Sequence, residues 1–302
     1  MTSREPQANQ TAQEASPTAR PTHDSMGLGR TSGQRGAEIF AGIRAENFPS
    51  PLTNALATWG GRVSARVLMA LSKRFIRDMQ PNTNYMIVRN KGLTQLVQAE
   101  LPEDQSDLLL IDIGSGFSPR GVELAWALPH AQIVEIDLPD VVREKQARLE
   151  RARDVEAPTN IRWLAADLGV VQLAEVLGDL RADVISAEGL TPYFPPNELI
   201  EMTSHFRACM KPHGVFVSDM AWKAGNRAAG PGASFVSRQA GRYLGAMEDQ
   251  EQACSIFEAA GYAETMIYMP TEVAQRFDLP QPVADLQFMV VARNQAKSPA
   301  AE

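Results

Sequence analysis

The chain has 302 residues, 44% of them hydrophobic and 7% aromatic, and a formal net charge of −7 at pH 7. This composition is sufficient for a globular core, and the acidic balance argues against a nucleic acid as partner, because phosphate binding favours a basic surface. No stretch reaches the ~18 consecutive apolar residues of a membrane-spanning helix, and a polar N-terminus with two cysteines in the whole chain favours a cytoplasmic protein.

The N-terminal third contains no strand-like pattern. Residues 1–34 are rich in Gln, Thr, Ala, Pro, Ser and Gly, and their apolar surface is too small to offset the entropy of ordering, so we expect a disordered tail. Helical spacing of apolar residues then predicts a helical cap over 35–104, with breaks at Gly60–Gly61 and Pro81 and a helix over 85–101. We expect this cap to extend the following domain rather than to form a separate one.

From residue 105 the pattern changes to short apolar runs that alternate with helical stretches. A buried parallel strand has a continuous apolar sequence, and seven such strands are expected. They are LLLIDIG (108–114), QIVEIDL (132–138), IRWLAADL (161–168), ADVISAEG (182–189), GVFVSDMAW (214–222), and runs near 263–269 and 285–293. The alternation predicts βαβ units, and the last two strands favour an antiparallel C-terminal hairpin. We therefore expect an α/β, Rossmann-like domain over 105–296 with a seven-stranded, mostly parallel sheet.

A glycine-rich turn follows the first expected strand. The segment Asp112-Ile-Gly114-Ser-Gly116 joins a strand to a helix, where glycines permit a sharp turn and bring backbone N–H groups close to a ligand. Asp137, 21 residues beyond Gly116, ends the second strand, where a carboxylate accepts hydrogen bonds from a ribose diol. A dinucleotide site needs a third glycine where this chain has Pro119, whereas S-adenosylmethionine has no pyrophosphate. We predict S-adenosylmethionine as cofactor, with Asp112 suited to its cationic aminobutyrate arm.

Further candidate site residues follow the third and fourth strands. Asp167, with Leu168 beside it, is placed to accept from the adenine amino group; the alternative is an N-cap for the helix expected at 171. Glu188 ends the fourth strand, beside the topological switch at which open α/β sheets bind ligands. Glu188 is expected to hydrogen-bond the cofactor or to hold a positive group. Tyr193 is expected to face the acceptor substrate, or else to pack under the following helix.

These motifs resemble the leucine carboxyl methyltransferase family, which includes bacterial polyketide O-methyltransferases. Three segments carry the resemblance: the Gly-x-Gly-x-x-x-Arg loop that ends at Arg120, the acidic-Asp-hydrophobic-Pro signature Glu135-Ile-Asp137-Leu138-Pro139 with Lys145 following, and the motif Glu188-Gly-Leu-Thr-Pro-Tyr193. They lie within about residues 85–220, and Ser118 and Pro192 depart from the family pattern. The resemblance implies a class I methyltransferase fold, cofactor contacts from Leu138 and Leu168, and a salt bridge from Arg89 to the cofactor carboxylate.

The resemblance implies an O-methyltransferase with Glu188 and Tyr193 as candidate catalytic residues. A carboxylate acceptor is already ionised at neutral pH and needs no base, whereas a phenol or alcohol usually does. The four histidines are poorly placed to act as that base: His23, His130, His205 and His213. A small-molecule or polyketide-like acid is therefore the favoured acceptor, although a protein C-terminus and a hydroxyl acceptor are also open.

Three alternatives to this function are considered. A metal-dependent enzyme of the catechol type would use Glu188 and Asp219, but no cluster of His, Cys and Asp has metal-ligand spacing, so we expect no metal. A nucleic-acid amino-methyltransferase would carry a different motif at the fourth strand. A binding or regulatory protein that keeps the fold without turnover is the non-enzymatic alternative.

The glycine-containing segment 223–245 is expected to act as a lid over the acceptor.

Overall fold

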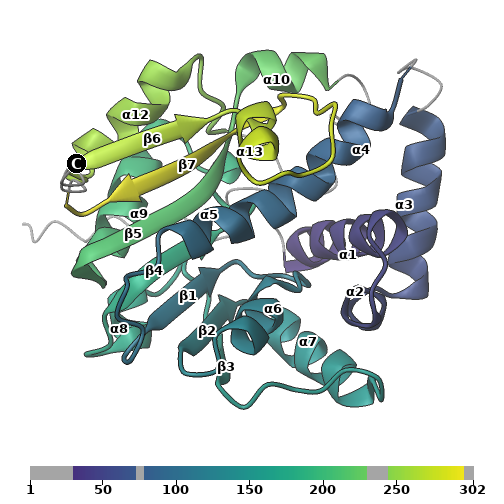
Figure 1. Ribbon diagram of the computed structural model, residues 1–302, viewed down its shortest axis with the longest axis horizontal. Coiled ribbons are helices and arrows are strands. Elements are labelled where there is room, and N and C mark those ends of the chain that lie inside the picture. Colours follow the sequence, from purple (N-terminus) through teal and green to yellow (C-terminus); the bar gives the residue numbers. More distant parts are fainter. Residues whose placement is uncertain (1–29, 73–77, 230–243, 296–302) are drawn as a thin grey trace, which may run out of the picture.

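The computed structural model describes residues 30–72, 78–229 and 244–295 (Figure 1). The expected tail therefore lies outside the described residues up to residue 29, and helix α1 (Arg30–Asn47) begins before the expected boundary at 35. Most of the expected lid, 230–243, also lies outside them, and its beginning forms helix α10 (Lys223–Ala228). No helix among the described residues is long and apolar enough to cross a membrane.

Helices make up the described part of the N-terminal region. After α1 come α2 (Pro51–Leu56), α3 (Trp59–Ser72), α4 (Gln80–Ile87), a π-helical segment (Val88–Gly92) and α5 (Leu93–Ala99). The predicted break at Gly60–Gly61 is wrong, because the chain leaves the helix at Ala57 and both glycines lie in the first turn of α3. Gly61 is needed for packing instead: a Cβ there would lie 2.6 Å from the carbonyl oxygen of Glu38 in α1.

A seven-stranded sheet forms the centre of the molecule (Figure 1). Its strands are β1 (Leu109–Ile113), β2 (Gln132–Asp137), β3 (Ile161–Ala165), β4 (Ala182–Ala187), β5 (Met210–Ala221), β6 (Glu264–Tyr268) and β7 (Gln287–Arg293). The order is β3-β2-β1-β4-β5-β7-β6, and β7 runs antiparallel to both of its neighbours while the first five strands are parallel. The predicted fold class is confirmed.

Helices cover both faces of the sheet, so its strands are buried on two sides. Alternate residues of β1 enter different cores: Leu110 packs into the core beneath α5, α6 (Arg120–Ala127) and α7 (Pro139–Arg151), and Ile111 into the opposite one. The opposite core is covered by α8 (Leu173–Leu177), α9 (Pro196–Ala208) and α12 (Gln250–Ala259). Helix α13 (Pro270–Arg276), between β6 and β7, was not expected from the sequence.

The sheet places ligand-binding turns at one point. The connection that leaves β1 leads to β2, and the one that leaves β4 leads to β5 on the other side. Because these two connections run in opposite directions, a crevice opens between the carboxyl ends of β1 and β4. Strands β3 and β4 end at Ala165 and Ala187, earlier than expected, so Asp167 and Glu188 lie in the turns that follow them. Helix α1 lies beside this edge of the sheet (Figure 1).

Candidate functional site

A cavity of about 220 Å³ opens at the carboxyl ends of β1, β2 and β4, with α1 as one wall. It brings together most of the residues that the sequence singled out: Arg89, Gly114, Gly116, Asp137, Leu138, Asp167, Leu168, Glu188 and Tyr193. Gly36, Ala37, Phe40 and Arg44 of α1 also line it. Asp112 is not among the lining residues.

The glycine turn after β1 and the acidic residue after β2 are bonded to each other. Gly114 and Gly116 have φ values of 64° and 49°, a region that favours glycine. The backbone N–H of Gly116 donates to Asp137 Oδ2 at 2.6 Å, and that of Leu138 donates to Oδ1 at 2.7 Å. Burial raises the pKa of Asp137, while these two bonds oppose the rise. Each carboxylate oxygen retains a further lone pair, as a diol acceptor requires.

Asp167 lies in the turn after β3 and stabilises that turn. Its Oδ1 accepts from the backbone N–H of Gly169 at 3.0 Å. Helix α8 begins only at Leu173, with Gln172 as its N-cap, so Asp167 is not the N-cap of that helix. The side chain instead belongs to the cavity wall, next to Leu168.

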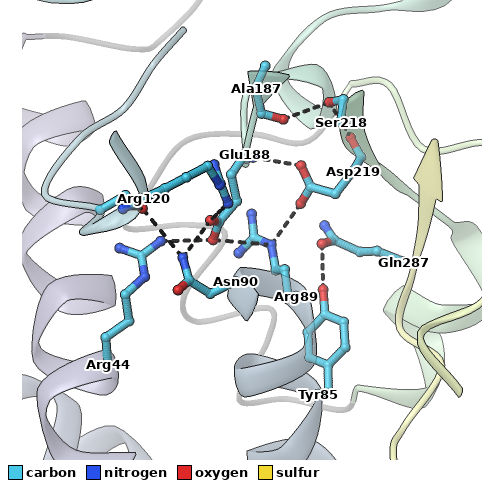
Figure 2. A network of polar contacts seen from close by, with 12 residues as sticks. Arg44, Tyr85, Arg89, Asn90, Arg120, Ala187, Glu188, Ser218, Asp219 and Gln287 are labelled. Atoms are coloured by element: carbon cyan, nitrogen blue, oxygen red, sulfur yellow. Dashed lines mark hydrogen bonds and ion pairs between the residues drawn. The ribbon is translucent and has the colours of Figure 1, made fainter. Parts of the chain in front are cut away.

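Three arginines surround Glu188, and we call these four residues the Glu188 cluster (Figure 2). Arg44 Nη2 lies 2.8 Å from Oε1, Arg120 Nη2 lies 2.5 Å from Oε2, and Arg89 Nε lies 3.9 Å from Oε1. Asn90 Nδ2 donates to Oε2 at 3.0 Å. Burial alone would raise the pKa of Glu188, but the arginines lower it far below the ordinary value. Glu188 is therefore a very weak base, because a proton on its carboxylate would have to displace the bonds from these arginines and Asn90.

Behind the cavity wall, Asp112 pairs with the cluster. Asp112 is 2% exposed, and its Oδ1 accepts from Ser186 Oγ at 2.6 Å and lies 3.3 Å from Arg120 Nη1. Burial disfavours the charge of Arg120, but Asp112 and Glu188 raise its pKa above the ordinary value. Asp112 does not line the cavity in this structure, and its Oδ1 contacts Arg120, which does.

The sequence did not single out Arg44 or Asn90 as site residues. Arg44 lies on α1, in a region without a recognisable motif, and reaches Glu188 only because α1 packs across the sheet edge. Asn90 follows Arg89 in the π-helical segment. Such segments are rare and frequently mark functional sites, but they have no reliable sequence signal. Arg89 itself is 6% exposed, so it does not lie on a solvated helix face.

Aromatic and apolar side chains form the remainder of the wall. They are Phe40 of α1, Leu190, Tyr193 and Phe194 of the segment after β4, and Met202 and Phe206 of α9. Tyr193 ends a short 3₁₀ turn (Thr191–Tyr193) and lines the cavity. The wall thus combines a polar part, formed by Asp137 and the Glu188 cluster, with an aromatic and apolar part in which Phe40 also contacts Arg89.

Asp219, in the alternative metal site, is paired with a cation of the chain itself. Arg89 Nε lies 2.7 Å from Asp219 Oδ2 and 3.9 Å from Glu188 Oε1, so a guanidinium lies between the two carboxylates (Figure 2). Within the described residues, no group of three or more His, Cys, Asp and Glu side chains is placed to hold a metal ion.

The fold is that of a class I methyltransferase. Four features define it: the strand order, the antiparallel β7, the glycine turn after β1 and the acidic residue at the end of β2. The chain belongs to the leucine carboxyl methyltransferase family, whose model matches residues 36–206, more than half of the chain. The protein is an S-adenosylmethionine-dependent O-methyltransferase.

Two solved structures are similar to the chain at low sequence identity. A candidate O-methyltransferase from Nostoc punctiforme is 20% identical with a TM-score of 0.50, over 85% of this chain and 72% of that one. Magnesium protoporphyrin IX methyltransferase from Synechocystis, with S-adenosylhomocysteine bound, is 15% identical with a TM-score of 0.46, over 70% of this chain and 84% of that one. No curated protein matches the chain in sequence.

Proposed function

We propose that the methyl acceptor is the carboxylate of a small organic acid and that the product is a methyl ester. The observation that carries this proposal is the state of Glu188. Its arginine neighbours lower its pKa far below the ordinary value and occupy its oxygens, so this carboxylate is too weak a base to take a proton from a phenol or alcohol. A carboxylate acceptor needs no such step, because it is ionised at neutral pH.

The lining residues fit the cofactor. S-adenosylmethionine supplies an electrophilic methyl group when bound. The glycine turn provides backbone N–H groups, Asp137 is the proposed acceptor for the ribose hydroxyls, and Asp167 with Leu168 is the proposed adenine contact. We assign the carboxylate of the cofactor to Arg89, with Gly114, Gly116 and Leu138 as further contacts. Glu188 orients the arginines of its cluster, and Asp112 acts through Arg120.

The acceptor is assigned to the apolar side of the cavity. Phe40, Tyr193 and Phe194 supply aromatic surface there, which suits an acid with an apolar body. Because Phe40 and Arg44 belong to α1, the helical cap is proposed to form the acceptor half of the crevice. Tyr193 is proposed to hold the acceptor in line with the methyl group, and alignment of this kind supplies much of the barrier reduction in a displacement.

A labelled-methyl assay tests the proposal. The full-length protein is incubated with S-adenosylmethionine that carries a labelled methyl group and with matched pairs of aromatic acids and phenols. We expect label in a product that mild alkali hydrolyses to methanol, as an ester requires. An alkali-stable methyl ether from a phenol would overturn the carboxylate assignment. Cofactor binding without any labelled product across both panels would instead favour the binding or regulatory alternative.

A further inference from the structure

Asp219 is a fully buried carboxylate that accepts from two different elements of the site. It lies near the carboxyl end of β5 and is 0% exposed. Its Oδ2 accepts from Arg89 Nε at 2.7 Å, and its Oδ1 accepts from the backbone N–H of Gly189 at 2.7 Å (Figure 2). One side chain thus joins the π-helical segment to the turn that carries Glu188.

The guanidinium of Arg89 is held from more than one side. Gly189 has a φ of 75°, and a Cβ at that position would lie 2.6 Å from Arg89 Nη2, so the arginine packs directly against the glycine. The ring of Phe40 lies 5.3 Å from Arg89 Cζ. The bond from Nε to Asp219 fixes the remaining freedom, which is rotation of the guanidinium within this packing.

The end of β5 also fixes the turn after β4. Ser218 Oγ donates to the carbonyl oxygen of Ala187 at 2.8 Å, and Thr191 Oγ1 donates to the carbonyl oxygen of Asp219. Together with the Gly189 bond, these contacts hold both sides of the Glu188 turn. The position of Arg89 relative to Glu188 is therefore set by β5, a strand whose own side chains do not line the cavity.

We infer that Asp219 is a positioning residue that gives the site its affinity for the amino-acid end of the cofactor. The inference rests on the proposed pairing of Arg89 with the cofactor carboxylate. A charge-assisted hydrogen bond to Nε sets the plane of the guanidinium, and carboxylate recognition by arginine depends on that plane. An asparagine of the same shape accepts from only one of the two donors and turns its own N–H₂ group toward the other.

The experiment compares two ligands that differ only at the amino-acid end. S-adenosylhomocysteine carries the carboxylate, and 5′-methylthioadenosine lacks the whole amino-acid portion. With the full chain and calorimetric titration, we expect Asp219→Asn to weaken S-adenosylhomocysteine binding about 10-fold or more. Binding of 5′-methylthioadenosine should change by no more than about twofold, a split that a general loss of structure would not produce.

Asp183→Asn is the matched control. Asp183 is 3% exposed, accepts from the backbone N–H of Leu109 at 2.9 Å and lies 2.9 Å from Lys211 Nζ, but at the opposite end of the strands. We expect it to leave the ratio of the two affinities unchanged. In an Arg89→Gln background, Asp219→Asn should add little further loss, because both changes remove the same interaction.

Four outcomes decide the inference. Equal weakening of both ligands by Asp219→Asn, or no weakening of either, overturns it. If Arg89→Gln weakens S-adenosylhomocysteine selectively and Asp219→Asn does not, the inference fails while the role of Arg89 stands. If Arg89→Gln itself shows no selectivity, the proposed pairing of Arg89 fails, and the inference with it. Should Asp219→Asn not fold, Gly189→Ala displaces the same Nη2 without a change of charge, and the same selective loss is required of it.

Discussion

At the residue scale, Glu188 belongs to a group of buried side chains in which positive and negative charges are equal in number. Arg44, Arg89 and Arg120 contact it, and Asp112 and Asp219 pair with two of these arginines from behind. Three cations are thus matched by three anions. A buried pair is stable only when its partners are complete, and removal of one partner leaves an uncompensated charge in a poorly hydrated place.

We therefore predict that Glu188→Gln lowers the free energy of unfolding by about 3–5 kcal/mol. The control is Glu46→Gln, which breaks the pairs of Glu46 with Arg66, whose side chain is 64% exposed, and with Arg62. That change should cost much less than Glu188→Gln, because solvent screens these pairs. Urea unfolding of both variants measures the difference. Equal costs would contradict the buried and coupled character of the cluster.

The pKa of Glu188 also gives the sign of an acid effect. Its folded-state pKa lies below the ordinary 4.5, so the carboxylate stabilises the fold at every pH above that value. This contribution is lost as pH falls below 4.5 toward the folded-state pKa. We expect the stability difference between wild type and Glu188→Gln to shrink on acidification, as thermal melts at descending pH would measure. A stability difference that stays constant with pH would show that the neighbouring arginines do not lower the pKa of Glu188.

The pKa of Asp137 is shifted in the opposite direction to that of Glu188. Burial raises its pKa above the ordinary 3.8, so it takes up a proton at a higher pH than an exposed aspartate. Affinity for S-adenosylhomocysteine should fall with pH through that raised value, because the protonated group is a weaker acceptor for the ribose hydroxyls. Asp137→Asn should bind about 1–3 kcal/mol more weakly and remove this pH dependence. Calorimetric titrations at descending pH measure both effects, and an unchanged pH profile in the variant would remove Asp137 from the ligand site.

Gly116 and Asp137 could be brought together from the sequence, whereas Arg44 on the cap could not. Gly116 and Asp137 follow adjacent parallel strands, so their meeting is dictated by the sheet. Arg44 and Glu188 are 144 residues apart, and their contact depends on how α1 crosses the sheet edge. The pairing of Asp112 with Arg120 likewise depends on packing that no local pattern reveals.

At the element scale, the packing of α1 against α3 depends on Gly42 and on Gly61, and the sequence pattern predicts a helix break at Gly61. Helices α1 and α3 cross at Gly42 and Gly61, and a Cβ on Gly42 would lie 2.2 Å from the carbonyl oxygen of Gly61. Periodicity identified the helical character of this region because it depends on apolar spacing alone. It could not distinguish a glycine that ends a helix from one that admits a neighbouring backbone, and this is why the predicted break was misplaced.

A pair of glycine substitutions separates these two roles. Gly42→Ala should destabilise the protein by about 1–3 kcal/mol, because the added methyl forces α1 and α3 apart. Gly60→Ala, in α3 with nothing within 4 Å of the added Cβ, should stabilise it by up to about 1 kcal/mol through reduced chain entropy. Thermal unfolding of the two variants measures both signs. Destabilisation of similar size in both would argue against the close crossing.

At the scale of the whole molecule, the cofactor half and the cap half contribute to one cavity. Each lining residue of the described chain lies at or beyond Gly36. A chain that begins at residue 30 should therefore bind S-adenosylhomocysteine within about twofold of the full chain. A chain that begins at residue 48 lacks Phe40 and Arg44 and leaves Glu188 short of one cation, so it should bind far more weakly. Calorimetry on the two truncations compares them; equal affinities would exclude α1 from the cofactor part of the site.

The long separation between ionic partners has a consequence for how the protein is made. Synthesis delivers the N-terminus first, so Arg44 and Arg89 emerge well before Glu188 and Asp219, which follow them by 144 and 130 residues. A guanidinium without its partner remains in water, because its burial is costly. Helix α1 and the π-helical segment therefore cannot settle on the sheet until β4 and β5 have joined it. The nascent chain therefore completes its ligand pocket only after β4 and β5 have emerged.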